Sequence, residues 1–378
     1  MSNIEVTYYS SVKEVSEDVF SDVSCENTFY FTRDFLYAFE LANPKIEYHY
    51  LVLSQNNTTI SLAILQGMSV AIDNAQEHLP FSERIARSLQ CYISARNVHT
   101  IVCGNVFLSG NYGVIIKEGI AQEPIYSTIA QMIQTVQTKK KASVFFFKDF
   151  VDQDLSVVSE VEKHQFQSLV VEPNMRLKIR TTWIDFDQYK ATLKSKYRVK
   201  VNKADKKSSA LTVKSFEAED IDTYRNQLQQ LYSNITDRAL FKTIDLEIET
   251  YRLLKIRFRE SVLINTYWYE NRMVGFATAF KVNNRLDAHF IGIDYMCNKE
   301  LSIYPRILND YVRLGIEMKV EEINFGRTSS EIKSTLGAIP ENLTCYVRHR
   351  RTVANLFFKP LVRQIKMKPY KQHTPFKK

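Results

Sequence analysis

Residues 286–326, LDAHFIGIDYMCNKELSIYPRILNDYVRLGIEMKVEEINFG, decide the fold. Alternating side chains predict a strand over Leu286 to Ile293. A helix is predicted over Ser302 to Lys319, where Pro305 suits the first turn. Its apolar residues Ile307, Tyr311, Leu314 and Met318 recur on one face. A buried strand over Glu322 to Phe325 follows the helix.

An antiparallel meander precedes this stretch. Strands are predicted over Ser261 to Tyr269 and Met273 to Lys281, with turns at Glu270-Asn271 and Asn283-Asn284. Helices are predicted upstream of the meander, over Tyr189 to Lys207, Ala218 to Tyr232 and Asp245 to Arg259. The second half of the chain therefore runs helices, meander, helix, strand.

The first half shows this order in partial form. We expect a helix over Arg33 to Leu41 and then a hairpin, with strands over Tyr48 to Leu53 and Thr59 to Leu65 around Asn56-Asn57. Further helices are expected over Ser82 to Ala95 and Pro124 to Lys139, and strands over Thr100 to Phe107 and Ala142 to Phe147. No sequence repeat is evident between the halves, so a duplication rests on this order alone.

The size of the chain indicates two domains. With 378 residues, 45% of them hydrophobic, it exceeds one ordinary core. The character of the sequence changes near Glu172-Pro173. We expect an N-terminal domain at 1–173, a C-terminal domain at 174–350, and a basic extension at 351–378.

Charge and cysteine content indicate where in the cell the protein is expected to act. The net charge is +8, but ten Lys and Arg lie between Arg348 and Lys378, and no acidic residue follows Glu341. The five cysteines are odd in number and widely spaced, which argues against a disulfide framework or structural zinc. Met1 to Ser10 lacks the apolar run of a signal peptide, and no stretch suits a membrane span. We expect a cytoplasmic protein, peripheral on the inner face of the membrane if the basic extension binds anionic lipid.

The segment with the most chemical character is residues 323–338, INFGRTSSEIKSTLGA. A strand leads into Gly-Arg-Thr-Ser, a loop with hydroxyl groups, a guanidinium and backbone amides. Such a loop can hold a carboxylate, a phosphate or an oxyanion. A capped turn with a surface arginine explains the same residues equally well.

This segment resembles the F-G-R-T/S-x-x-x-x-K-x-x-x-G-A signature of FemAB-like proteins, a two-domain branch of the GNAT superfamily. Three further stretches are similar to the same group, in the same order along the chain. They are Leu193 to Lys207, His289 to Asp294 followed by Ser302 to Pro305, and Val102 to Gly110. The resemblance implies an α/β (α+β) fold of two tandem GNAT-like domains, each a mixed, mostly antiparallel sheet flanked by helices.

The resemblance also implies an enzyme, an N-acyltransferase that moves an acyl or aminoacyl group onto an amine. The glycine-rich pyrophosphate loop usual in GNAT proteins is absent, because Asp294 to Ser302 stands in its place. A bulky or carrier-bound acyl donor is therefore favoured over acetyl-CoA. We expect acyl-CoA or an acyl carrier protein as donor substrate, no bound cofactor and no metal.

Several residues are candidates for the site. His289, Asp294 and Tyr304 could handle the proton. Arg327, Thr328, Ser329 and Lys333 are expected to bind substrate or donor, as are Asn105 and Ser109 of the first half. For each of them a structural role remains the alternative: a strand histidine is often structural, and Tyr304 could pack in the core.

Two basic segments suggest a polyanionic partner. Lys190 to Lys207 carries eight Lys or Arg, which suit a phosphorylated donor or an RNA backbone, or a plain solvated face. Val353 to Lys368 mixes apolar and basic residues as an interfacial membrane segment does, and a final element that closes the second domain with a basic outer face explains the same residues equally well. The acceptor is accordingly expected to be a lipid or sugar amine. An aminoacyl-tRNA-dependent peptidoglycan-type transferase and a non-catalytic binding protein on a degenerate GNAT scaffold are the alternatives.

Overall fold

The computed structural model describes most of the chain and divides it into two compact units. The described residues are 4–23, 29–70, 98–138, 141–238, 244–364, 367 and 369–377. The helix expected over Ser82 to Ala95 lies outside them. The first unit comprises 1–172, 240–246 and 342–368, and the second comprises 173–239, 247–341 and 369–378. The predicted third segment, 351–378, is thus shared between the two units.

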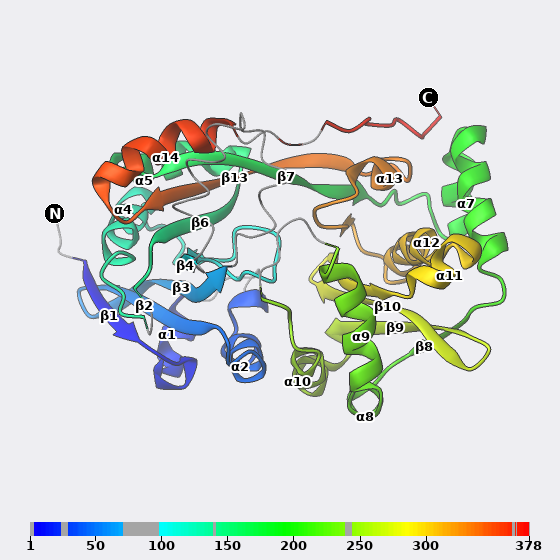
Figure 1. Cartoon of the computed structure of the whole chain (residues 1–378), viewed down its shortest axis with the longest axis horizontal. Coiled ribbons are helices and arrows are strands. Elements are labelled where there is room, and N and C mark those ends of the chain that lie inside the picture. The colour runs from blue at the N-terminus through cyan, green and yellow to red at the C-terminus, as the bar shows by residue number, and fades with distance from the viewer. Residues whose placement is uncertain are drawn as a thin grey trace. The chain divides into compact units, whose positions relative to one another are not determined.

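The sheet of the first unit is mostly antiparallel (Figure 1). Its strands follow the order β1-β2-β3-β4-β6-β13, with β5 paired to β3, and only β4 and β6 run parallel. The strands are β1 (Glu5–Tyr9), β2 (Glu47–Gln55), β3 (Thr58–Val70), β4 (Val98–Cys103), β5 (Val114–Ile116), β6 (Val144–Val151) and β13 (Ile339–His349). Its α-helices are α1 (Glu17–Val23), α2 (Arg33–Ala42), α4 (Gln122–Met132), α5 (Leu155–Lys163) and α14 (Thr352–Gln364).

The second unit holds the strands β7-β12-β11-β10-β9-β8, in that order in the sheet. Its strands are β7 (Gln167–Lys178), β8 (Thr212–Ser215), β9 (Val262–Tyr269), β10 (Arg272–Val282), β11 (Arg285–Ile293) and β12 (Glu322–Asn324). Its helices are α6 (Phe186–Thr192), α7 (Ser195–Lys207), α8 (Ala218–Thr223), α9 (Arg225–Thr236), α10 (Glu249–Phe258), α11 (Tyr295–Leu301), α12 (Ile303–Glu317) and α13 (Ser330–Ser334). The predicted meander is confirmed, and its turn residues Glu270, Asn271 and Asn283 have positive φ.

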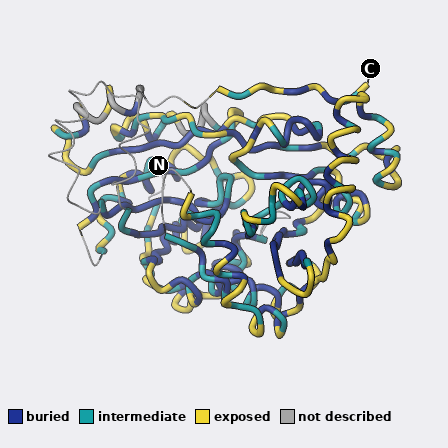
Figure 2. Tube along the Cα trace, turned by 45° about the vertical axis from the view of Figure 1, so that its right-hand side comes forward, coloured by how far each residue is buried: buried dark blue, intermediate teal, exposed yellow. Residues whose placement is uncertain are grey.

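The two faces of the second sheet are covered by different helices. Ala277 and Ala279 of β10 belong to the same buried cluster as Ile307 of α12. Thr278, between them, points the opposite way and bonds to Tyr251 of α10. Alternation along β10 therefore places α12 on one face and α10 on the other. Figure 2 shows the buried strands between helices whose outer sides are exposed.

The predicted basic helix over Tyr189 to Lys207 is wrong in one respect, because the structure divides it into α6 and α7. Leu193 is extended, with φ −75° and ψ 140°. It pairs as an isolated bridge with Phe376 near the C-terminus, and the Lys194 amide donates to the Pro375 carbonyl at 2.8 Å. This long-range pairing outweighs the local helical preference of the sequence.

Candidate functional site

Strand β12 pairs along its three residues with the beginning of β11. The parallel ladder joins Arg285, Leu286 and Asp287 to Glu322, Ile323 and Asn324, respectively. On its other side β12 pairs with β7, and beyond Asn324 this pairing continues, since the Phe325 amide donates to the Met175 carbonyl at 2.8 Å. Within the described residues, β11 from Ala288 to Ile293 has β10 as its strand partner. The second half of β11 therefore offers a strand edge toward the place that β12 leaves.

His289 lies on this part of β11 and is half-buried. Its Nδ1 is 2.6 Å from the hydroxyl of Tyr251 on α10. That hydroxyl is 3.0 Å from Oγ1 of Thr278, which is itself 2.7 Å from the Phe290 carbonyl oxygen. Tyr251 and Thr278 are 2% and 1% exposed, so the chain of polar groups behind the histidine is sealed from water.

Assigning the hydroxyl protons by what each partner can accept gives a tautomer for neutral His289. A carbonyl oxygen can only accept, so the single hydroxyl proton of Thr278 goes to Phe290. Thr278 then accepts from Tyr251, whose burial raises its pKa well above 10.0 and keeps its proton in place. The Tyr251 oxygen accepts in turn from Nδ1–H of His289. The proton-accepting lone pair of the imidazole is therefore on Nε2.

The Gly-Arg-Thr-Ser loop has an unusual backbone. Gly326, Thr328 and Ser329 all have positive φ, at 68°, 64° and 51°. This conformation is costly for a β-branched residue such as Thr328, and strained backbone of this kind is concentrated at functional sites. Thr328 and Ser329 are exposed, and Arg327 is half-buried.

Lys333 holds this loop from inside. Its side chain is only 4% exposed, and Nζ donates to the carbonyls of Phe325, Gly326 and Arg327 at 2.8, 3.2 and 2.6 Å. An ammonium has three protons, which these carbonyls match. The structure thus directs Lys333 to the loop backbone, whereas the sequence had suggested contact with a bound anion.

Tyr304 and Ser329 come together, although they lie on separate elements. Tyr304 is in the first turn of α12, and its hydroxyl is close enough to the Ser329 side chain for that side chain to lower its pKa. Burial raises the pKa of Tyr304, and the contact with Ser329 offsets part of that shift. The phenol therefore keeps its proton at neutral pH. Two of the predicted site residues thus form one contact beside the strained loop.

Asp294 has a different place. Its carboxylate caps α11, with Oδ1 accepting from the Met296 amide at 2.9 Å. The other oxygen, Oδ2, is 2.8 Å from Nη1 of Arg272. Both carboxylate oxygens are engaged in holding the start of α11. A negative charge at this helix start also disfavours a nucleotide diphosphate there.

Asn105 and Ser109 belong to the first unit. Asn105 is 3% exposed, and its Oδ1 accepts from the Phe107 amide at 3.0 Å, which shapes the turn after β4. Gly110, next to Ser109, donates its amide to Oδ2 of buried Asp149 at 3.2 Å. Within the described residues no cluster of His, Cys, Asp or Glu suits a metal ion.

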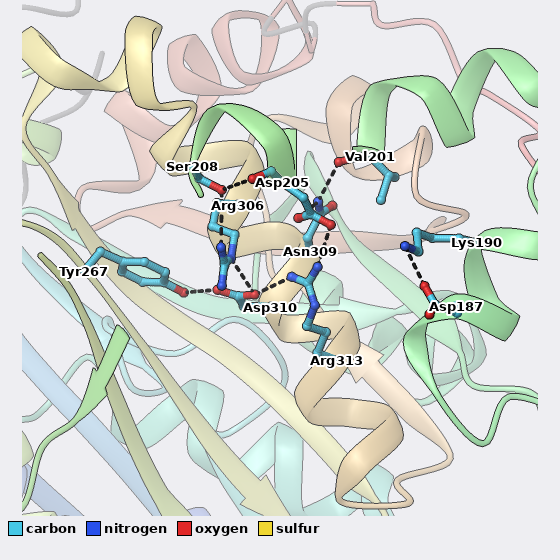
Figure 3. A network of polar contacts seen from close by, with 10 residues as sticks. All are labelled: Asp187, Lys190, Val201, Asp205, Ser208, Tyr267, Arg306, Asn309, Asp310 and Arg313. Atoms are coloured by element: carbon cyan, nitrogen blue, oxygen red, sulfur yellow. Dashed lines mark hydrogen bonds and ion pairs between the residues drawn. The ribbon is translucent and has the colours of Figure 1, made fainter. Parts of the chain in front are cut away.

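A network of charged side chains fixes α12 against α7 (Figure 3). Asp310 of α12 accepts from Nε of Arg306 at 2.8 Å, from Nη1 of Arg313 at 2.5 Å and from the Tyr267 hydroxyl at 3.0 Å. Arg313 also donates to Asp205 of α7 at 2.6 Å. The helix that carries Tyr304 therefore has a firm support in the second unit.

Comparison with solved structures identifies the fold. The C-terminal domain (DUF2156) of a protein assigned as a lysylphosphatidylglycerol synthetase, from Agrobacterium fabrum, matches with TM-score 0.52 and 9% identity over 91% of this chain and 97% of that chain. FemX matches with TM-score 0.52 and 10% identity over 90% of this chain and 96% of the FemX chain. A tandem GNAT protein from the clavulanic acid biosynthesis pathway matches with TM-score 0.53 and 9% identity over 92% and 99%.

The chain has a tandem GNAT fold. The predicted fold class and the resemblance to FemAB-like GNAT proteins are thereby confirmed at the level of fold. No protein-family profile matches the chain. No curated protein matches it with significance. The fold alone fixes neither the reaction nor the substrate.

Two important residues were missed at the level of sequence. Tyr251 and Thr278 determine which nitrogen of His289 carries the proton, but they lie on α10 and β10, far from it along the chain. Neither belongs to a recognisable motif. Only the pairing of β10 with β11 and the packing of α10 bring the three side chains together.

We predict that Lys333→Met loosens the strained loop, because three carbonyls lose their shared donor. The cost is about 1–3 kcal/mol of unfolding free energy. Urea unfolding can be followed by the fluorescence of Trp183 and Trp268, the two tryptophans of the chain, both in the second unit. Trypsin should also cut faster after Arg327. Exposed Lys299→Met is the control, and equal behaviour of both variants would contradict this role.

Proposed function

We propose that the protein is an N-acyltransferase that moves an acyl group from a thioester to the amine of a lipid or sugar. The observation that carries the proposal is the end of the β11–β12 ladder at Asp287, with His289 two residues further along β11 and hydrogen-bonded through Nδ1 to Tyr251, which leaves Nε2 as the proposed base. The tandem GNAT fold supports the reaction class. Acceptor and donor are inferred from the chemistry of the chain.

His289 serves as the base for the incoming amine. Nε2 takes a proton from the ammonium, and the amine nitrogen then attacks the thioester carbonyl carbon. A tetrahedral oxyanion forms, its nitrogen loses a second proton to water, and it collapses with breakage of the C–S bond, giving an amide and a thiolate. Backbone N–H groups at the β11 edge are suitable donors for the oxyanion.

Tyr304 serves as the acid for the departing sulfur. Its pKa is raised by burial, so the phenol holds a proton that the thiolate can take. Solvent water returns the proton, and the proton on His289 is released when the product amide leaves. His289 faces α10 and Tyr304 starts α12, so the two groups act from opposite faces of β11.

The donor is proposed to be a pantetheine thioester, as in acyl-CoA or an acyl carrier protein. The amide groups of pantetheine can hydrogen-bond to a strand edge as an added strand does. Asp294 at the start of α11 counts against a diphosphate at that place. The protein is therefore proposed to recognise the donor mainly through its pantetheine arm, which carries the thiol.

We predict that His289→Gln lowers kcat by about 100-fold or more. Tyr251→Phe should lower kcat by about 10-fold with little change in KM, because the imidazole loses its orienting partner. The acidic limb of the pH–rate profile should move in Tyr251→Phe. The assay offers palmitoyl-CoA and palmitoyl-loaded acyl carrier protein with a panel of lipid and sugar amines and detects amides by mass spectrometry.

Tyr311→Phe is the matched control for this prediction. Its buried hydroxyl donates to the Thr278 carbonyl at 2.8 Å and does not approach His289. The Tyr311→Phe substitution should lower the free energy of unfolding by about as much as Tyr251→Phe does, but it should leave the pH–rate profile unchanged. Full activity in His289→Gln would remove the histidine from the mechanism, and no amide from any donor and amine would overturn the proposed function.

A membrane surface is the proposed source of a lipid acceptor. Val353 and Leu356 of α14 are 69% and 70% exposed, one helical turn apart, and Arg351 and Lys359 beside them are exposed cations. Buried Val362 packs the other side of α14 against Val144 and Val347. This pattern suits shallow insertion into an anionic bilayer. No helix in the described ranges is long and apolar enough to cross a bilayer.

We predict that Val353→Asp with Leu356→Asp weakens binding to phosphatidylglycerol vesicles by about 10-fold or more, because burial of two apolar side chains is replaced by repulsion. Cosedimentation with vesicles measures this. Leu41→Asp, at a residue 50% exposed on α2, is the control. Equal vesicle binding by the wild type and the double variant would contradict the proposed membrane contact of α14.

A further inference from the structure

Helix α7 carries a face of exposed lysines. Its exposed cations are Lys196, Lys200, Lys203, Lys206 and Lys207. In the described part of the chain none of them forms an ion pair with a carboxylate. The one acidic residue of α7, Asp205, is engaged by Arg313 and Asn309 at 2.6 and 2.9 Å. The charge of this face is therefore available to a partner.

The basic face extends onto the C-terminal residues of the second unit. The amide and Nζ of Lys194 donate to the carbonyls of Pro375 and Thr374, at 2.8 and 2.9 Å. His373 lies 3.1 Å from the Tyr197 hydroxyl through Nδ1. These contacts hold exposed Lys371 and Lys377 in the same unit as α7.

The lysine face is rigidly mounted. Asp205 and Asn309 join α7 to α12, and Arg306 reaches Ser208 at the end of α7 (Figure 3). Tyr197, Val201 and Ala204 are buried on the inner side of the helix. A surface that is already ordered loses little entropy when a partner binds.

An apolar residue lies within the lysine face. Val199 is 58% exposed, and Lys196 and Lys203 flank it one helical turn before and after. Protein interfaces combine an apolar centre with a charged rim. A phosphate backbone would gain nothing from the valine. The pattern therefore favours an acidic protein surface over a nucleic acid.

The face also stands beside the proposed donor site. Nζ of Lys207 donates to the Lys299 carbonyl of α11 at 3.2 Å, and α11 follows β11 directly. A protein docked on α7 is thus close to the end of the strand whose edge is proposed to hold the thioester. The carboxylate of Asp294 lies at the same place and repels a nucleotide diphosphate.

We propose that α7 is the docking surface for an acidic carrier protein that presents the acyl group as a pantetheine thioester. The inference rests on the proposed acyl transfer and specifies its donor. Acidic side chains of the carrier pair with the lysines, and an apolar side chain covers Val199. The pantetheine arm then runs past α11 to β11. Free acyl-CoA lacks the acidic surface and binds more weakly.

The test compares two donors on the full-length protein. Lys196→Glu with Lys203→Glu should weaken binding of palmitoyl-loaded acyl carrier protein by at least about 10-fold at low salt and flatten its salt dependence. Turnover of palmitoyl-CoA should stay within about 2-fold of wild type. Val199→Ala should weaken carrier binding several-fold. Lys45→Glu with Lys141→Glu, exposed lysines of the first unit, is the charge-matched control.

The outcomes separate the docking surface from the proposed function. Unchanged carrier binding in the α7 variant, with normal turnover of both donors, overturns the docking surface and leaves acyl transfer standing. Carrier binding that depends on α7 without amide formation supports the surface and contradicts the proposed function. Tight binding of an RNA hairpin that needs the same lysines, with no carrier binding, overturns the inference in favour of a nucleic acid.

Discussion

The parting of β11 and β12 is the constraint on which the rest of the site depends. Strand β12 pairs with β7 on one side and with β11 on the other, and after Asn324 only the pairing with β7 continues in the described chain, through Phe325 and Met175. The edge of β11 beyond Asp287 is where a ligand is proposed to bind as its neighbour. His289 stands on one face of that edge and the helix of Tyr304 covers the other.

The most conspicuous charges near the site support structure. Lys333 is bound to three carbonyls and Asp294 to a helix start and an arginine. The loop that Lys333 fixes carries less common backbone conformations. A buried charge is stable only with such partners, so its presence indicates a fixed scaffold. Proton movement is proposed to fall to the His289 imidazole and to the Tyr304 phenol, whose pKa is raised by burial.

How well the sequence predicts a feature of this structure depends on how far apart in the sequence the interacting residues lie. The meander was predictable because its turns are local and use asparagine at positive φ. His289 and Tyr304 were identified as candidates by residue type and position. The orientation of His289 was not, since Tyr251 is 38 residues away on another element. The break between α6 and α7 was not predicted either, because the bridge from Leu193 to Phe376 overrides the helical preference of the local sequence.

Hydrogen–deuterium exchange with a non-hydrolysable acyl-pantetheine thioether measures whether β11 takes the donor as its neighbour. A ligand that pairs with the edge of β11 must protect backbone amides there. We expect slower exchange in peptides covering Ala288 to Ile293, with the loop from Gly326 to Ser329 protected as well. Protection elsewhere in the described chain, with β11 exchanging at the same rate with and without ligand, would contradict this pairing.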